Sequence, residues 1–427
     1  MIIRLLLACS LLLTGCVIKD LKDDLDIVEA DYGYLKGRAS GSEGDADILF
    51  ALVTEGDQGA EIVTTRSVSL DEEFYVLVPA GEYTLITFSD SNGDFAYQPG
   101  EPAAQIENPT VNWFRDMKGQ ERVDYGGLTI QEIELSGATV LDEGFDLSLS
   151  SLRANSNTAQ NFLRVVTWDD EAFSAEHTEM GMWQPGLFER EVGYGLYVLE
   201  EFDPAKRTIL FVHGISDTPV RFRSIVEVMP AGYQAVMLHY PSSFPLEYTS
   251  YLLKEALDEM VRRYELTSVD VVAHSMGGLV SKGMIYQADE TLLEKMNVFV
   301  TMSSPFGGHS AAAAGIKWAP VTAPVWWAMA PGSTYLTTID GLDLTNGPAH
   351  HLVYTYSEET GGPRAEDDGV VTVDSQLADS ARANAVGIYG IADNHTGVTS
   401  NPCVTGLVWN VLAGGTDEPV PPGCTFE

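Results

Sequence analysis

Ser275 lies where the sequence changes from a strand-like run to a helix-like run, a position in which a serine can act as a nucleophile. Residues 269–273 are apolar and mostly β-branched, and residues 279–286 have helical character. Ala273 and Gly277 are small enough for a tight turn that lifts the hydroxyl above the end of a sheet. A serine hydroxyl attacks an ester only when a base takes its proton, so this turn predicts nucleophilic catalysis with a histidine partner. The other interpretation is a serine that caps a helix after a turn.

The serine turn is one of five short segments that follow one another along the chain. They are Gly195-Leu196-Tyr197, Phe211-Val212-His213-Gly214-Ile215, Tyr240-Pro241-Ser242, Ala273-His274-Ser275-Met276-Gly277-Gly278 and Ser304-Pro305-Phe306-Gly307-Gly308. Together they resemble the lipase/esterase branch of the α/β-hydrolase superfamily, which includes bacterial lipases and GPI-inositol-deacylase-like enzymes. The resemblance extends from about Met182 to the C-terminus. Two departures are that Ala273 replaces the usual glycine and that the region before Thr208 has no clear equivalent.

This resemblance implies the chain order serine, acid, histidine, which restricts the choice of base. Of the eight histidines, only His395 follows the acidic turn at residues 365–371. Asp368, immediately before a Gly-Val-Val run, is the predicted acid, and Asp367 and Asp393 are the alternatives. His395 would serve as general base and acid, and the carboxylate would orient its ring.

The resemblance also implies an oxyanion hole and an activity. Its two donors would be the backbone N–H groups of Ile215 and Met276. The implied function is hydrolysis of carboxylic esters, with lipid-like acyl chains as substrates, through an acyl-enzyme that requires no cofactor. One alternative is a phospholipase or acyltransferase with the same triad. Another is a non-catalytic surface-binding lipoprotein with an inert hydrolase fold.

Residues 206–427 have the alternating pattern of an α/β domain. Apolar residues at helical spacing predict a helix over 252–264, and short β-branched runs predict strands at 208–212, 235–238, 269–273, 298–302, 352–356 and 387–391. This alternation predicts a mostly parallel central sheet with helices on both faces. Residues 307–348 form an Ala- and Trp-rich insertion, for which the resemblance implies a cap that contacts acyl chains or a lipid surface. Buried packing of the same aromatic residues is the alternative.

The part of the chain before this domain has a different pattern. Short β-rich runs separated by turns over residues 48–150 predict a small all-β sandwich, and residues 151–205 are expected to be a connecting segment. The predicted fold class is therefore an α/β-hydrolase preceded by a β-sandwich.

A loop in the β-rich region carries alternating oxygen ligands. Asp90, Asn92 and Asp94, with Glu101 further on, have side chains that could converge on a structural calcium ion. The loop resembles the Asp-Asn-Asp turn of prealbumin-like modules. An Asx-stabilised β-turn without metal is the other interpretation.

The N-terminus has the features of an export signal. A short apolar run after Arg4 ends in Leu13-Thr14-Gly15-Cys16, which resembles the bacterial lipoprotein box. Residues 1–15 would then be removed, lipid on Cys16 would anchor the protein to a membrane, and residues 16–47 would form a tether. The expected location is the cell envelope, with the outer membrane favoured because Val17 is not aspartate.

Charge and cysteine content fit this assignment. The chain has 24 Lys and Arg against 62 Asp and Glu, a net charge of −38, which excludes nucleic acid as a partner. An apolar fraction of 45% in 427 residues excludes a disordered chain. Cys403 and Cys424 remain after export and could form a disulfide, with two free thiols as the alternative.

Overall fold

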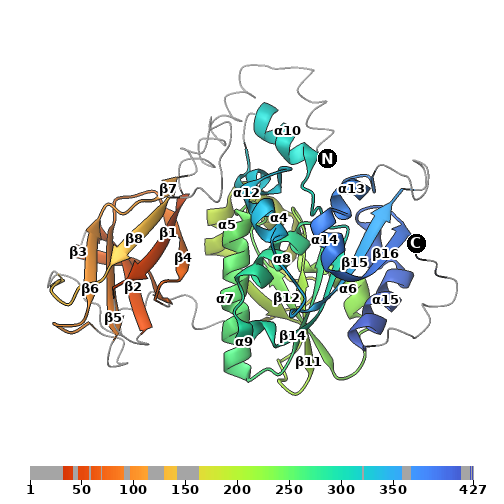
Figure 1. Cartoon of the computed structure of the whole chain (residues 1–427), viewed down its shortest axis with the longest axis horizontal. Helices are drawn as coiled ribbons and strands as arrows, with labels where there is room; N and C mark the ends of the chain where they lie inside the picture. The colour runs from red at the N-terminus through yellow and green to blue at the C-terminus, as the bar shows by residue number, and fades with distance from the viewer. Residues whose placement is uncertain are drawn as a thin grey trace. The chain divides into compact units, whose positions relative to one another are not determined.

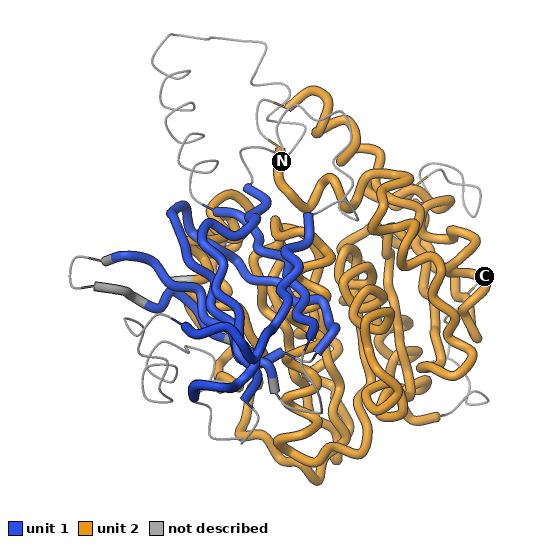
Figure 2. The backbone as a smooth tube through the Cα atoms, turned by 60° about the vertical axis from the view of Figure 1, so that its left-hand side comes forward, with its two compact units in different colours: residues 1–121, 129–152 blue, residues 122–128, 153–427 orange. Residues whose placement is uncertain are grey.

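The chain divides into two compact units, residues 1–121 with 129–152 and residues 122–128 with 153–427 (Figure 2). The computed structural model describes residues 32–41, 47–56, 59–68, 70–90, 97–113, 129–141, 163–319, 322–357, 367–414, 424 and 426. The predicted signal peptide and the predicted lipidation site at Cys16 lie outside these residues and stay predictions. Within the described residues, no helix has the length and apolar character needed to cross a membrane.

The first unit is all-β and contains two sheets. One sheet has the order β4-β1-β7, with β8 also paired to β1, and the other has the order β3-β2-β5-β6. Phe50 from β2 and Phe74 from β4 stack at 4.7 Å between ring centroids, so the two sheets share a core. The strands are β1 (Tyr32–Ser40), β2 (Asp47–Gly56), β3 (Gly59–Val68), β4 (Glu73–Pro79), β5 (Thr84–Asp90), β6 (Ala103–Glu107), β7 (Asn112–Trp113) and β8 (Ile130–Glu134).

The first unit begins earlier in the chain than the sequence predicts. Residues 32–40, within the predicted tether 16–47, form β1, which pairs with three other strands. The strand contains glycines and charged residues, so its sequence lacks the alternation of apolar and polar residues that predicts a strand. Gly37 leaves room for the ring of Phe74, and buried Lys36 pairs with Glu73 at 2.9 Å.

The second unit is built on an eight-stranded sheet with the order β16-β15-β14-β13-β11-β12-β10-β9. The pairs from β16 to β12 are parallel, and β10 is antiparallel to β12. The six strands predicted from β-branched runs are all present. The strands are β9 (Leu163–Val165), β10 (Gly195–Val198), β11 (Arg207–Val212), β12 (Tyr233–His239), β13 (Val269–His274), β14 (Met296–Met302), β15 (Ala349–Tyr356) and β16 (Ala385–Ala392).

Helices cover both faces of this sheet, as the alternating pattern predicts (Figure 1). Ile209 and Phe211 of β11 share a core with residues of α6 and α15, whereas Gly277 of α8 lies against the backbone of Val212. The helices are η3 (Glu171–Phe173), α4 (Ala175–Trp183), α5 (Pro185–Glu191), η4 (Pro219–Phe222), α6 (Arg223–Val226), α7 (Leu246–Tyr264), α8 (Met276–Gln287), α9 (Glu290–Leu293), α10 (Ser310–Trp318), α11 (Pro324–Met329), α12 (Thr334–Asp340), α13 (Val373–Gln376), α14 (Asp379–Asn384), η7 (Gly397–Ser400) and α15 (Pro402–Leu412).

The segment predicted as a connection, residues 151–205, is part of the second unit where the structure describes it. Residues 163–205 supply β9, β10, α4 and α5. Tyr197 of β10 is fully buried, and Leu196 pairs with Leu238 of β12. β9 has three residues and β10 has four. Strands this short are difficult to recognise from the spacing of apolar residues in the sequence.

The insertion between β14 and β15 contains three short helices, α10, α11 and α12. Val325 and Ala328 of α11 are buried, and Trp326 makes an edge-to-face contact with Trp183 of α4. Trp318 at the end of α10 is instead 75% exposed. Trp326 is therefore packed against the rest of the unit, whereas Trp318 is exposed, and contact of the insertion with acyl chains or a lipid surface stays a prediction.

Candidate active site

Ser275 occupies a strained turn between β13 and α8. Its backbone has φ 54° and ψ −128°, a region that non-glycine residues rarely adopt. A hydrogen bond from its N–H to the carbonyl of Met302, 2.8 Å long, holds the turn against β14. The turn places the serine at the carboxyl end of a central strand, as the sequence predicts.

Three glycines allow other chain segments to approach this turn closely. A Cβ on Gly277 would lie 2.1 Å from the carbonyl oxygen of Val212, and one on Gly278 would lie 2.1 Å from Oγ of Ser304. A Cβ on Gly214 would lie 2.9 Å from the Cβ of Ser275. These contacts explain why small residues surround the serine in sequence and in space.

His395 lies beside the serine, in the loop between β16 and η7. Its Nε2 is 2.9 Å from Oγ of Ser275, and its Nδ1 is 2.9 Å from Oδ2 of Asp368. The geometry fits a ring that donates from Nδ1 to the carboxylate and accepts the serine hydroxyl proton at Nε2. The structure thus brings together the three residues that the sequence predicts as a triad.

Asp368 is buried and held by several donors. Its Oδ1 accepts the N–H groups of Val370 and Val371, and its Oδ2 accepts the hydroxyl of Thr355 at 2.6 Å. Burial raises the pKa of this carboxyl, but the hydrogen bond and charge of His395, with the other donors, outweigh burial and hold the pKa below its usual value. The carboxylate is therefore ionised at neutral pH.

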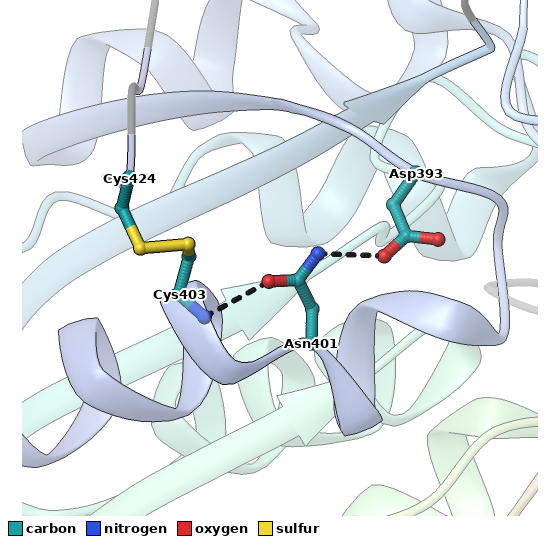
Figure 3. Close-up of a disulfide and its surroundings, with 4 residues drawn as sticks. All are labelled: Asp393, Asn401, Cys403 and Cys424. Atoms are coloured by element: carbon teal, nitrogen blue, oxygen red, sulfur yellow. Dashed lines mark hydrogen bonds between the residues drawn. A yellow bond between two sulfur atoms is a disulfide. The ribbon is translucent and has the colours of Figure 1, made fainter. Parts of the chain in front are cut away.

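The two alternative acids have other partners. Asp367 accepts the N–H of Gly369, and Asp393 accepts the side-chain amide of Asn401 at 2.8 Å (Figure 3). Asp393 also accepts the N–H of Asn394. Of these three carboxylates, Asp368 is the one whose hydrogen bond to the ring of His395 is found among the described residues.

The predicted oxyanion donors belong to the two segments that meet at Ser275. Met276 is the first residue of α8, where a backbone N–H has no acceptor within the helix. Ile215 follows Gly214, whose backbone lies against the serine. This loop is held by the hydroxyl of Tyr240, which donates to the carbonyl of His213, and by Oγ of Ser242, which accepts the N–H of Ser216.

Four other histidines near or within the sheet are buried and electrically neutral. Burial lowers the pKa of His213 to about 4 and the pKa values of His239, His274 and His350 to about 3. His213 stacks on the ring of Tyr240. None of the four takes the place of His395 at the serine.

Several supporting residues were not singled out from the sequence. Thr355 of β15 and Gln376 of α13 contact Asp368, and His274 contacts the backbone of His395. His309, the N-cap of α10, is close enough for His395 and Asp368 to influence its pKa, which burial lowers. Thr355 and Gln376 belong to no recognisable sequence motif, and only the position of His274 next to the serine offered a local signal.

An open groove lies next to the loop that carries Ile215. It is lined by side chains from residues 168–174, 217–224 and 399–400. Arg221 in this groove pairs with Asp217 at 2.5 Å. No triad residue lines the groove, so it is a neighbouring surface and not the nucleophile pocket.

The predicted calcium site is only partly described. Asn92 and Asp94 lie outside the described residues, whereas Asp90 and Glu101 are buried in the first unit. One carboxylate oxygen of Glu101 accepts the N–H of Gln98. The described residues contain no group of three or more His, Cys, Asp or Glu side chains suited to a metal ion, and the calcium site stays a prediction.

The disulfide prediction is confirmed. Cys403 at the start of α15 is bonded to Cys424, with their Cα atoms 5.5 Å apart (Figure 3). Asn401 caps α15 by accepting the N–H of Cys403, and its amide donates to Asp393. The bond therefore ties Cys424 to α15.

The strand order and the turn at Ser275 define the second unit as an α/β-hydrolase domain. Residues 245–315 match the family model of the PGAP1-like alpha/beta domain. This segment runs from the start of α7 through the nucleophile turn into α10. No curated protein matches the chain in sequence.

The solved structures to which the chain is similar are distant from it in sequence. The mature lipase BlEst2 of Bacillus licheniformis is 17% identical, with coverage of 50% of this chain and 94% of that chain and a TM-score of 0.37. The lin2722 product of Listeria innocua is 15% identical, with coverage of 50% and 97% and a TM-score of 0.38. Phospholipase PlaB of Legionella pneumophila is 15% identical, with coverage of 40% and 45% and a TM-score of 0.33.

Proposed function

We propose that this protein is a serine hydrolase that cleaves carboxylic esters. The observation that carries the proposal is the continuous set of contacts from Ser275 Oγ to His395 Nε2 and from His395 Nδ1 to Asp368, each 2.9 Å. These are the distances and chain order that a serine nucleophile, its base and its orienting acid require. The α/β-hydrolase fold supports the same reaction class.

In the proposed reaction, His395 takes the hydroxyl proton while Ser275 Oγ forms a bond to the ester carbonyl carbon. The negative charge that develops on the carbonyl oxygen is stabilised by the N–H groups of Ile215 and Met276. The tetrahedral intermediate collapses with loss of the alcohol, to which His395 gives its proton. Water activated by the same histidine then releases the acid from the acyl-enzyme. Asp368 stays ionised throughout and stabilises the imidazolium.

We infer further that the acyl part of the substrate is lipid-like. The support is the surface of α10, where Trp318 and three alanines, Ala311, Ala313 and Ala314, are exposed. Exposed apolar side chains of this kind suit contact with acyl chains or a lipid surface. Lipid on Cys16 would hold the protein at the cell envelope, with the outer membrane as the favoured location.

The first experiment measures hydrolysis of p-nitrophenyl esters from acetate to palmitate by protein that begins at Val17. Ser275→Ala is the control, and it should lose several orders of magnitude in kcat/KM. Loss of activity in this variant supports the triad, and the preferred chain length reports the size of the acyl site. If folded wild-type protein is no faster than Ser275→Ala on every ester, hydrolysis of simple esters is contradicted.

A second measurement distinguishes the remaining activities. The products of a phospholipid substrate are analysed with and without an added acceptor alcohol. Free fatty acid in both samples supports a hydrolase, whereas acylated alcohol supports a transferase. A fluorophosphonate that fails to label Ser275 in folded protein would instead support a non-catalytic binding role.

A further inference from the structure

His274, the residue before the nucleophile, contacts the base as well. It is the last residue of β13, and only 2% of its surface is exposed. Its Nε2 lies 2.8 Å from the backbone carbonyl oxygen of His395, and the two rings are 4.9 Å apart between centroids. Because a carbonyl oxygen only accepts, the proton of His274 is on Nε2.

The bond from His274 is one of two hydrogen bonds that hold the backbone of His395. The N–H of His395 donates to the carbonyl of Asp368 at 3.1 Å, and its carbonyl accepts from His274. Both backbone polar groups of the base are thus bonded to the acid and to the neighbour of the nucleophile. The loop connects β16, which lies at the edge of the sheet, to η7, and it is also held by the bond between Asn401 and Asp393.

The charge state of His274 suits this role. Burial lowers its pKa, and the positive charge of His395 lowers it further, whereas Asp217 acts in the opposite direction and Arg221 in the same direction as burial. The ring is therefore neutral when the triad works, with Nε2 as donor. Its Nδ1 has no hydrogen-bond partner among the described residues, so the bond to His395 is the only one its ring makes there.

We propose that His274 is a positioning residue for the reaction. It holds the His395 carbonyl so that the ring of the base keeps Nε2 at the hydroxyl of Ser275. Displacement of a reacting group by about 1 Å can lower a rate by about 10²-fold, so loss of this restraint should appear in kcat. The proposal rests on the proposed function of the triad.

The test compares three variants in the detergent-solubilised full chain, with a p-nitrophenyl ester as substrate. His274→Leu removes the donor, His274→Gln offers an amide N–H that can reach the same carbonyl, and His274→Asn offers one on a shorter side chain. We expect about a 10- to 100-fold loss of kcat in the Leu and Asn variants, with KM within twofold. The Gln variant should recover most of the loss.

His350 supplies the matched control. It is buried to the same degree, and its Nε2 bonds to the hydroxyl of Thr301 on β14 instead of to the triad. His350→Leu should lower the melting temperature as His274→Leu does, yet leave kcat within twofold. If kcat fell only because the protein is less stable, it would fall in His350→Leu as well as in His274→Leu.

The following results would contradict the positioning role of His274 or, separately, the proposed function. Equal kcat in wild type and in His274→Leu, or equal loss in the Gln and Asn variants, removes the positioning role. If His274→Leu does not fold, the ratio of kcat between the Gln and Asn variants decides the question. If Ser275→Ala is as active as wild type, the proposed function itself fails, whatever the His274 variants show.

Discussion

The backbone N–H of His395 donates to the backbone carbonyl of Asp368 at 3.1 Å, so acid and base are tied through their main chains as well as through their side chains. The residues are 27 positions apart and follow neighbouring parallel strands, β15 and β16. The carboxyl ends of parallel strands lie on the same side of a sheet, and Ser275, which follows the central strand β13, lies on that side too.

The role of Asp368 leads to a first prediction. Asp368→Asn should lower kcat/KM by about 10³- to 10⁴-fold, because an amide no longer holds the tautomer of His395 or stabilises its charge. Asp367→Asn and Asp393→Asn are matched controls and should stay within about threefold. Ester hydrolysis under steady-state conditions measures all three. An Asp393→Asn variant as inactive as Asp368→Asn would move the acid role to Asp393.

The buried histidines lead to a second prediction, on stability against pH. In the unfolded chain a histidine has a pKa near 6.5, whereas His239, His274 and His350 have pKa values of about 3 and His213 of about 4 in the folded protein. Below pH 6.5 the unfolded state therefore binds more protons, and the free energy of unfolding falls as pH falls from 6.5 toward 4. Each such group contributes a slope of up to about 1.4 kcal/mol per pH unit.

Urea unfolding at pH 7, 6 and 5 measures this slope. His350→Gln should be less stable at pH 7 but should lose less free energy of unfolding between pH 7 and pH 5 than wild type. Thr291→Ser, at an exposed position of helix α9, changes no titratable group and serves as the control for the slope. A variant slope equal to the wild-type slope would mean that His350 is not buried as a neutral ring.

The sequence allowed prediction of the parts of the site that depend on local pattern and chain order. The small residues around Ser275 follow from the tight turn, and His395 follows from its position after the acidic turn. Thr355 and Gln376 support Asp368 from β15 and α13, and nothing in their own surroundings in sequence distinguishes them. Their role depends on strand pairing across the sheet, which local periodicity does not determine.

The fold was likewise predictable where runs were long and apolar. The six parallel strands were found, but β1 was missed because Gly37 makes room for Phe74 and Lys36 is buried with Glu73. Burial of a paired charge is a tertiary event, so a rule that counts apolar residues assigns such a strand to a linker.

The disulfide leads to a third prediction. Replacement of Cys403 and Cys424 by serine should lower the melting temperature by several degrees, because a closed loop of this length stabilises a protein by roughly 3 kcal/mol. The turnover number should stay within about twofold, since neither cysteine contacts Ser275 or His395. Thermal unfolding with and without dithiothreitol measures the effect. Wild type should become less stable on reduction, and the double variant should show no response to the reductant.

The close approach of Gly214 to the nucleophile leads to the last prediction. In Gly214→Ala the new Cβ would lie 2.9 Å from Cβ and 3.3 Å from Oγ of Ser275, so either the serine or the loop that carries Ile215 must move. Loss of one oxyanion donor typically lowers kcat by about 10²- to 10³-fold, and we expect a loss of that size.

Gly195→Ala is the matched control for this variant, because a Cβ at Gly195 meets no atom within 4 Å. It should keep wild-type kcat and a similar melting temperature. Gly214→Ala should retain cooperative unfolding and labelling of Ser275 by a fluorophosphonate, at a lower rate. Full activity in Gly214→Ala would contradict this prediction, because it would show that the crowding is relieved without loss of transition-state stabilisation.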